Sequence, residues 1–187
     1  MKRLLSLTIM QVIVMTVIAQ EQLINGVIEK KQVVVVEGVS ADKLYVRALE
    51  ALSDWAGAQG KSKIGIDVQD KDEGLVVYKG QLEMGFHKVN FMAGWEVYAD
   101  FTIKIKCKDG RAQVLAIVPS LTFDWSAKQY PATETVQISA IYPEYNYKSK
   151  LRIKKAAMEF APLAPSMFDN IIASLAAKLQ QQQDDDF

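Results

Sequence analysis

The sequence predicts an α+β fold in two layers, with an antiparallel sheet whose helices pack on one face. Three observations support this prediction: an amphipathic helix placed between strand patterns, a series of alternating strands at hairpin spacing, and a second amphipathic helix near the C-terminus. The expected order of elements is β-α-β-β-β-β-α. A sheet covered by helices on one side leaves its other side facing solvent.

The first strand and helix are expected in residues 33–60, where a run of four valines leads into an amphipathic segment. Ser40 is placed to act as the N-cap, and Asp42 puts negative charge at the positive end of the helix dipole. Gly57 and Gly60 mark the end of the helix. Apolar residues that recur every three or four positions form its buried face: Ala41, Leu44, Tyr45, Ala48, Leu49, Leu52, Trp55 and Ala56.

Three strand patterns follow the helix. In the first, Ile64, Ile66 and Val68 alternate with polar or small residues and are expected to point the same way. The second covers residues 75–84 and follows a polar turn. The third, at 97–107, alternates most regularly, and its inward residues are Val97, Ala99, Phe101, Ile103, Ile105 and Cys107.

The Asp109-Gly110 pair separates this third strand from another alternating run that ends near Trp125. Asp-Gly between two such runs is a strong signal for a two-residue hairpin loop. A two-residue loop also determines which residues face each other across the hairpin. The expected pairs are Cys107 with Ala112, Ile105 with Val114, Ile103 with Ala116 and Phe101 with Val118.

The C-terminal third is expected to be less regular. Residues 126–165 are an irregular extension rich in proline, tyrosine and lysine, with one short strand near 136–140. Residues 166–180 are a second amphipathic helix, in which Met167, Phe168, Ile171, Ile172, Leu175 and Leu179 share a face. Residues 181–187 contain no apolar stripe and are expected to be a disordered tail.

The N-terminus has the pattern of a secretory signal. Lys2 and Arg3 precede an apolar run that ends near residue 19, and we expect cleavage there, with an uncleaved anchor as the alternative. Residues 20–32 are then an N-terminal linker. The predicted location is the periplasm or cell envelope, with no membrane span after cleavage. The only cysteine is Cys107, so the chain lacks the cysteine that a lipoprotein carries at its cleavage point.

Charge and composition narrow the possible functions. Without Lys2 and Arg3, the mature chain has 20 basic and 22 acidic residues, a formal charge of −2. A nearly neutral protein lacks the basic footprint on which nucleic-acid affinity depends. One cysteine cannot form an internal disulfide, and the length is that of one domain with a core of its own.

Several of these segments together resemble a known family. They are the valine run with its helix, the Gly-Leu-Val-Val-Tyr-Lys-Gly strand at 74–80, the long strand at 97–107 and the Lys-Asp-Gly-Arg hairpin. In residues 33–125 the chain resembles domain of unknown function 4468. The resemblance implies a TATA-binding-protein-like fold in an exported protein of Bacteroidetes. It implies no activity, cofactor or functional residue, and the fold name carries no implication of DNA binding.

Catalytic and metal chemistry has little support in the sequence. His87 is the only histidine and lies in no nucleophile motif. Zinc needs three or four ligands, and one histidine and one cysteine cannot supply them, so no metal or cofactor is expected. Carboxylates at Glu96, Asp100 and Asp124 leave a periplasmic hydrolase as an alternative.

The open face of the sheet is the predicted working surface. Thr102, Lys104, Leu115 and Ile117 fall on the side opposite the inward row, and they make that side partly apolar. We therefore expect a non-enzymatic binding or envelope-associated module whose partner is an envelope protein or a glycan. Further surfaces are the aromatic residues in and before the extension and the basic run at 148–155. A self-associating structural subunit is the remaining alternative.

Overall fold

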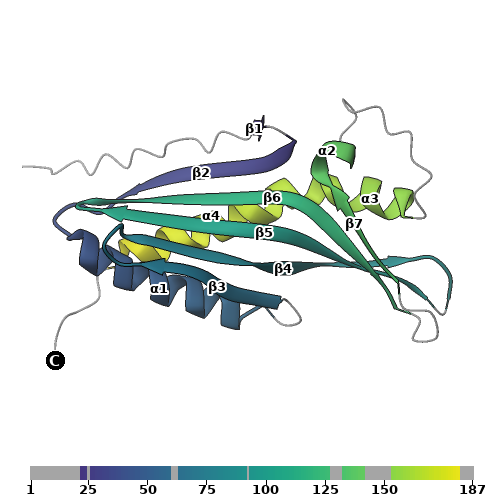
Figure 1. Cartoon of the computed structure of the whole chain (residues 1–187), viewed down its shortest axis with the longest axis horizontal. Helices are drawn as coiled ribbons and strands as arrows, with labels where there is room; N and C mark the ends of the chain where they lie inside the picture. The colour runs from purple at the N-terminus through teal and green to yellow at the C-terminus, as the bar shows by residue number, and fades with distance from the viewer. Residues whose placement is uncertain are drawn as a thin grey trace, which may run out of the picture.

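The computed structural model describes residues 22–24, 26–59, 63–91, 93–126, 132–141 and 153–181. The predicted signal at 1–19 and the tail beyond residue 181 lie outside these residues. Within them, an antiparallel sheet forms one layer and helices form the other (Figure 1). The two-layer α+β class and the expected order of the main elements are confirmed.

The sheet in the described residues has seven strands in the order β1-β2-β6-β5-β4-β3, and β7 continues along the edge of β6 that β2 leaves free. All pairs are antiparallel. The strands are β1 (Gln22–Ile24), β2 (Val27–Val35), β3 (Lys63–Asp70), β4 (Leu75–Lys88), β5 (Gly94–Lys108), β6 (Arg111–Trp125) and β7 (Thr133–Gln137).

Strand β2 starts earlier than the sequence predicts, because residues 27–32 belong to the sheet and not to a linker. Ile28 and Val34 point into the core, at 3% and 2% exposed. Between them, Lys30 is also buried. A charged residue at an inward position interrupts the apolar alternation by which a strand is predicted from sequence. An ion pair with Asp169 compensates the burial of Lys30.

Two long helices cover one face of the sheet. Helix α1 (Ala41–Gly57) begins after the predicted N-cap and ends at the first of the two predicted glycines. The Ser40 hydroxyl accepts a hydrogen bond from the Lys43 backbone N–H at 3.4 Å. Helix α4 (Ala164–Gln180) starts two residues before the predicted position. Both helices run along the same side of the sheet (Figure 1). The expectation that the helices share one face is confirmed.

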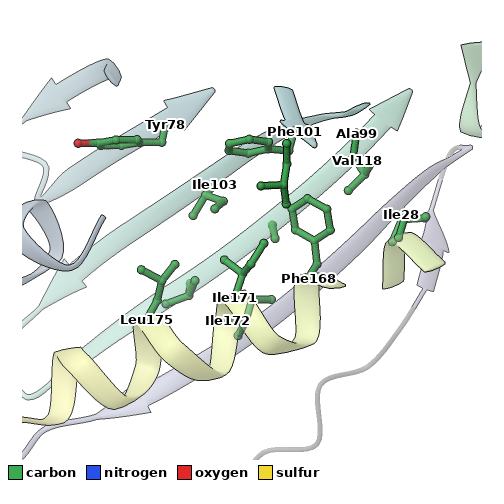
Figure 2. Close-up of a cluster of buried hydrophobic side chains, with 14 of the residues drawn as sticks. Ile28, Tyr78, Ala99, Phe101, Ile103, Val118, Phe168, Ile171, Ile172 and Leu175 are labelled. Atoms are coloured by element: carbon green, nitrogen blue, oxygen red, sulfur yellow. The ribbon is translucent and has the colours of Figure 1, made fainter. Parts of the chain in front are cut away.

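The core lies between this helix pair and the sheet. The Phe101 ring of β5 meets Trp55 of α1 edge-on, with centroids 5.6 Å apart, and lies 6.0 Å from the Phe168 ring of α4. Figure 2 shows Ile171, Ile172 and Leu175 pointing from α4 toward the sheet. One aromatic side chain of the sheet therefore contacts both helices.

The β5–β6 hairpin confirms three of the four predicted pairs: Cys107 with Ala112, Ile105 with Val114 and Ile103 with Ala116. The pairing of Phe101 with Val118 is wrong. Thr102 faces Ile117 but Asp100 faces Ser120, so β6 carries one extra residue here. Pro119 lies in this bulge, and a bulge tolerates proline because its missing N–H leaves no ladder bond unmade. The partner of this edge of β6 also changes from β2 to β7 at this point.

Strand β3 is likewise less regular than expected. Its register shifts between Ile66 and Val68, so Val68 pairs with Val77 and points to the face opposite Ile66. The prediction that the three apolar residues share a side is therefore wrong for Val68. Ile66 is 49% and Val68 39% exposed, because β3 is the edge strand of the sheet.

The predicted irregular extension contains regular elements. β7 overlaps the expected strand only at residues 136–137, and α2 (Ile138–Ile141) follows it directly. Helix α3 (Lys154–Phe160) and the 3₁₀ turn η2 (Ala161–Leu163) lead into α4. His87 of β4 contacts Glu159 of α3 at 2.5 Å, which ties the extension to the sheet. Among the described helices, none is long and apolar enough to cross a membrane.

Candidate binding surface

The four residues predicted as a surface patch are direct neighbours on the open face, which we define as the side of the sheet opposite α1 and α4. Thr102 of β5 faces Ile117 of β6, and two residues along, Lys104 faces Leu115. Lys104 is exposed, and the other three are half-buried. Side chains of directly opposite residues touch across a sheet. The two pairs therefore form one continuous patch.

The neighbouring strands extend this patch. Val77 of β4 lies beside Lys104, and Lys31 of β2 lies beside Leu115. Val77 is only 5% exposed although no described helix covers this face. Long side chains such as lysine cover apolar neighbours with their methylene stems, and Lys104 and Lys79 are placed to do so. The patch thus has an apolar centre with positively charged residues around it.

A groove of about 380 Å³ lies on the open face toward the β5–β6 turn. Lys106, Lys108 and Arg111 line it together with Val33, Ala112 and Gln113. This groove was not predicted from the sequence. One sequence pattern does indicate its basic lining: lysines alternate along β5, and the Asp109-Gly110 turn places Lys108 beside Arg111.

Positive charge dominates this part of the open face, which we call the basic half. Lys106 pairs with Glu73 at 3.3 Å, and Lys79 pairs with Asp67 at 2.9 Å. The other cations of the basic half form no ion pair with the described residues. The basic half consists of Lys31, Lys79, Lys104, Lys106, Lys108 and Arg111.

The other part of the open face, the acidic half, begins at Asp100. The Asp100 carboxylate accepts hydrogen bonds from Ser120 at 2.7 Å, Thr122 at 2.9 Å and the Gln81 amide at 2.9 Å. Ser120 and Thr122 are buried polar residues, and these bonds satisfy their hydroxyl groups. The acidic half contains Glu83, Glu96, Asp100 and Asp124, together with Lys63 of β3, whose Nζ lies 6.0 Å from the centroid of the Tyr98 ring.

Tyr98 lies at the centre of the acidic half and is 4% exposed. Burial raises the pKa of its phenol to about 12, aided by the hydrogen bond that Tyr98 donates to Glu96 at 2.9 Å and by the charges of Glu96, Glu83 and Asp124. A phenol with this pKa stays neutral at physiological pH. Tyr98 therefore acts here as a hydrogen-bond donor to a carboxylate.

The carboxylates considered for hydrolysis do lie on one surface. Glu96 faces Asp124 across β5 and β6, and Asp100 lies two positions beyond Tyr98. One Asp124 oxygen, Oδ1, is buried without a hydrogen-bond partner. The groove described above is lined by basic residues and not by this cluster. Among the described residues, no group of three or more histidine, cysteine or acidic side chains is placed to hold a metal ion.

The other candidates from the sequence lie elsewhere. His87 is engaged by Glu159 on the helix-covered side. Cys107 is 3% exposed, and burial raises the pKa of its thiol to about 11, so the thiol stays protonated. Phe123 is fully buried, and Trp125 packs against Trp95 with ring centroids 4.9 Å apart. The tyrosines of the extension and the basic residues at 148–152 lie outside the described residues.

These features define an α+β protein in which one face of an antiparallel sheet is closed by helices and the other carries separate basic and acidic halves. The family model described as "Domain of unknown function (DUF4468) with TBP-like fold" matches residues 31–116. Residues 31–116 thus form a domain of the DUF4468 family, as the sequence resemblance implied. A comparison with curated proteins finds no match.

Solved structures share the fold at low sequence identity. A DUF4468 family protein from Bacteroides ovatus matches with a TM-score of 0.61 and 12% identity, over 88% of this chain and 92% of that one. A TBP-like protein from Parabacteroides distasonis matches with a TM-score of 0.52 and 11% identity, over 83% of this chain and 96% of that one. At these identities the comparison concerns the fold alone.

Proposed function

We propose that this chain is a non-enzymatic binding module of the cell envelope, and that the open face of its sheet is the binding surface. The adjacency of the Thr102–Ile117 and Lys104–Leu115 pairs, on a face without a described helix, is the observation that carries the proposal. An apolar patch ringed by polar side chains is typical of a surface that binds a partner.

Export to the envelope is part of the same proposal. Its support is the positively charged start, the short apolar run and the small residue at position 19. Detection of the mature N-terminus by mass spectrometry of the periplasmic fraction tests this part. A chain retained in the cytoplasm with residues 1–19 intact would contradict it.

The binding surface is tested by affinity capture from envelope extract with the chain starting at Gln20. One variant carries Lys104→Asp, Leu115→Asp and Ile117→Asp. The matched control carries Lys43→Asp, Val46→Asp and Met158→Asp, which alter the same kinds of side chain on the helix side, where Val46 and Met158 are 48% and 60% exposed. Circular dichroism and thermal unfolding establish that both variants are folded.

We expect the native chain and the control to retain the same specific partner and the open-face variant to lose it. Three introduced carboxylates in an apolar contact would lower affinity by at least about 100-fold, since burying even one unpaired charge costs several kcal/mol. Equal retention by all three chains would show that the open face is not the binding surface. Loss of oligomers in the open-face variant, with no other partner, would favour the self-associating subunit.

A further inference from the structure

The distribution of charge on the open face points to the kind of partner that it fits. The basic and acidic halves share strands β4, β5 and β6, with Thr102 and Ile117 between them. Opposite charges on a single surface attract an anionic ligand at one half and repel it at the other. An anionic partner would therefore be confined to the basic half, which contains the groove.

The cations in the basic half are arranged as a row. Lys104, Lys106 and Lys108 occupy alternate positions of β5 and point to the same side, and Arg111 faces Lys108 across the hairpin. Alternate residues on a strand are about 7 Å apart, so this row extends about 14 Å. A single small anion cannot contact side chains spread over that length. A linear ligand with repeated negative charges can contact all of them.

Most of these cations have no acidic partner among the described residues. Lys106 alone in the row forms an ion pair, with Glu73, and that pair is exposed on both sides. An exposed ion pair contributes little free energy and exchanges readily. Arg111 adds a planar guanidinium, which binds carboxylate, sulfate or phosphate groups through two hydrogen bonds. The row is therefore available to an external anion.

The type of strand favours a polysaccharide over a peptide. β5 and β6 are interior strands whose backbone groups are used in the ladders with their neighbours. A peptide that binds by strand addition needs a free sheet edge, which this part of the face does not offer. The groove offers cationic side chains, and the apolar Val33 lies beside them. Charged groups and sugar-ring faces of a glycan match these two features.

Single-stranded nucleic acid is a weaker fit. Its bases bind by stacking on aromatic side chains. The described residues that pair with Lys104 and Lys106 are valine, leucine and glutamine, while the aromatic Tyr98 lies in the acidic half. A nucleic-acid ligand would thus have its phosphates at one half and its stacking partner at the repelling half.

We infer that the groove formed by Lys106, Lys108, Arg111 and Val33 binds a linear acidic polysaccharide along the lysine row of β5. This inference rests on the proposed function, because it names the class of ligand for the same open face. The ligand is held by charge and by contacts with the sugar rings, and its binding weakens as salt concentration rises.

The test uses the chain from Gln20 and fluorescently labelled dextran sulfate as the probe. Neutral dextran of the same length, polyglutamate and single-stranded DNA are the comparison ligands. The groove variant carries Lys106→Gln, Lys108→Gln and Arg111→Gln. The control variant carries Lys43→Gln, Lys88→Gln and Lys155→Gln, which remove the same total charge outside the basic half.

We expect the native chain to bind dextran sulfate and not neutral dextran, with weaker binding to polyglutamate and DNA. Each exposed charge contact contributes about two- to fivefold in affinity, so the groove variant should lose at least about tenfold. The control variant should remain within about twofold of the native chain.

Three outcomes would overturn the inference: no binding of dextran sulfate, equal loss in the groove and control variants, or equal affinity for DNA or polyglutamate. If envelope capture depends on Lys104, Leu115 and Ile117 but dextran sulfate does not bind, only the ligand class fails. If dextran sulfate binding depends on the groove but envelope capture does not depend on the open face, the proposed function fails and the groove is still a site for an acidic polysaccharide.

Discussion

The two faces of strands β4, β5 and β6 differ although they are built from alternate residues of the same segments. On β5, Phe101, Ile103 and Ile105 face the helices and are at most 3% exposed. Between them, Thr102 is half-buried and Lys104 and Lys106 are exposed. The hydrophobic effect makes the covered face the source of stability, which leaves the residues of the open face available for binding.

Each face also contains residues of the opposite character. Lys30 is a charged residue on the covered face, where it pairs with Asp169. Tyr98 is an aromatic residue on the open face, where it is buried among carboxylates. The difference between the faces is thus a matter of local partners as well as of alternation. Substitutions at these residues, and at one apolar residue on each face, test how the two faces differ.

The largest expected effect is the removal of a core aromatic ring. Phe168→Ala on α4 deletes a fully buried side chain that contacts Phe101, and should lower the free energy of unfolding by about 3–5 kcal/mol. Ile117→Ala on the half-buried open face should lower it by about 1 kcal/mol. Urea unfolding followed by circular dichroism measures both. Similar losses would mean that the open face contributes to stability as much as the core does.

The next effect concerns the buried charge on the covered face. Asp169→Ala leaves Lys30 buried without its partner and should lower the free energy of unfolding by about 3 kcal/mol. This is the lower end of the range for a broken buried ion pair, because the Asp169 side chain is 48% exposed. Lys30→Met removes the charge and keeps the volume, and should change stability by less than about 1 kcal/mol. The same unfolding measurement applies. A larger loss for Lys30→Met than for Asp169→Ala would contradict this account of the pair.

The smallest effect concerns Tyr98 and appears only at high pH. The pKa of Tyr98 is about 12 in the folded chain and about 10 when unfolded, so between these values only the unfolded state loses its proton. The contribution of this group to stability is therefore fully present and constant below pH 10, and it is lost as pH rises from 10 toward 12. Stability measured across this range should fall less steeply in Tyr98→Phe than in the native chain. Identical slopes would show that folding does not raise the pKa of Tyr98.

Local sequence patterns were sufficient for the main elements. Helix α1 needed only its N-cap and its apolar spacing, and three cross-strand pairs followed from the Asp109-Gly110 turn. The same turn placed Thr102 near Ile117 and Lys104 near Leu115. The pattern failed beyond Val118 and at Val68, where bulges reverse the alternation. A bulge adds one residue without changing composition, so periodicity alone does not detect it.

Several features required the folded structure. The start of β2 was missed because Lys30 occupies an inward position, and a lysine is acceptable there only because Asp169 of α4 lies beside it. The groove was missed because it combines Val33 of β2 with residues of β5 and β6. Elements far apart in sequence form such a site, and no local pattern records which of them become neighbours.

The alternation of residues and the hairpin turn are local properties, because they depend on backbone geometry over a few positions. They are enough to specify a two-faced sheet with helices on one side and to identify which residues lie on the other. The division of the open face into basic and acidic halves depends on the pairing of β2, β4, β5 and β6 over long sequence separations. Tertiary structure decides it because electrostatic interactions act through space between side chains that only folding brings together.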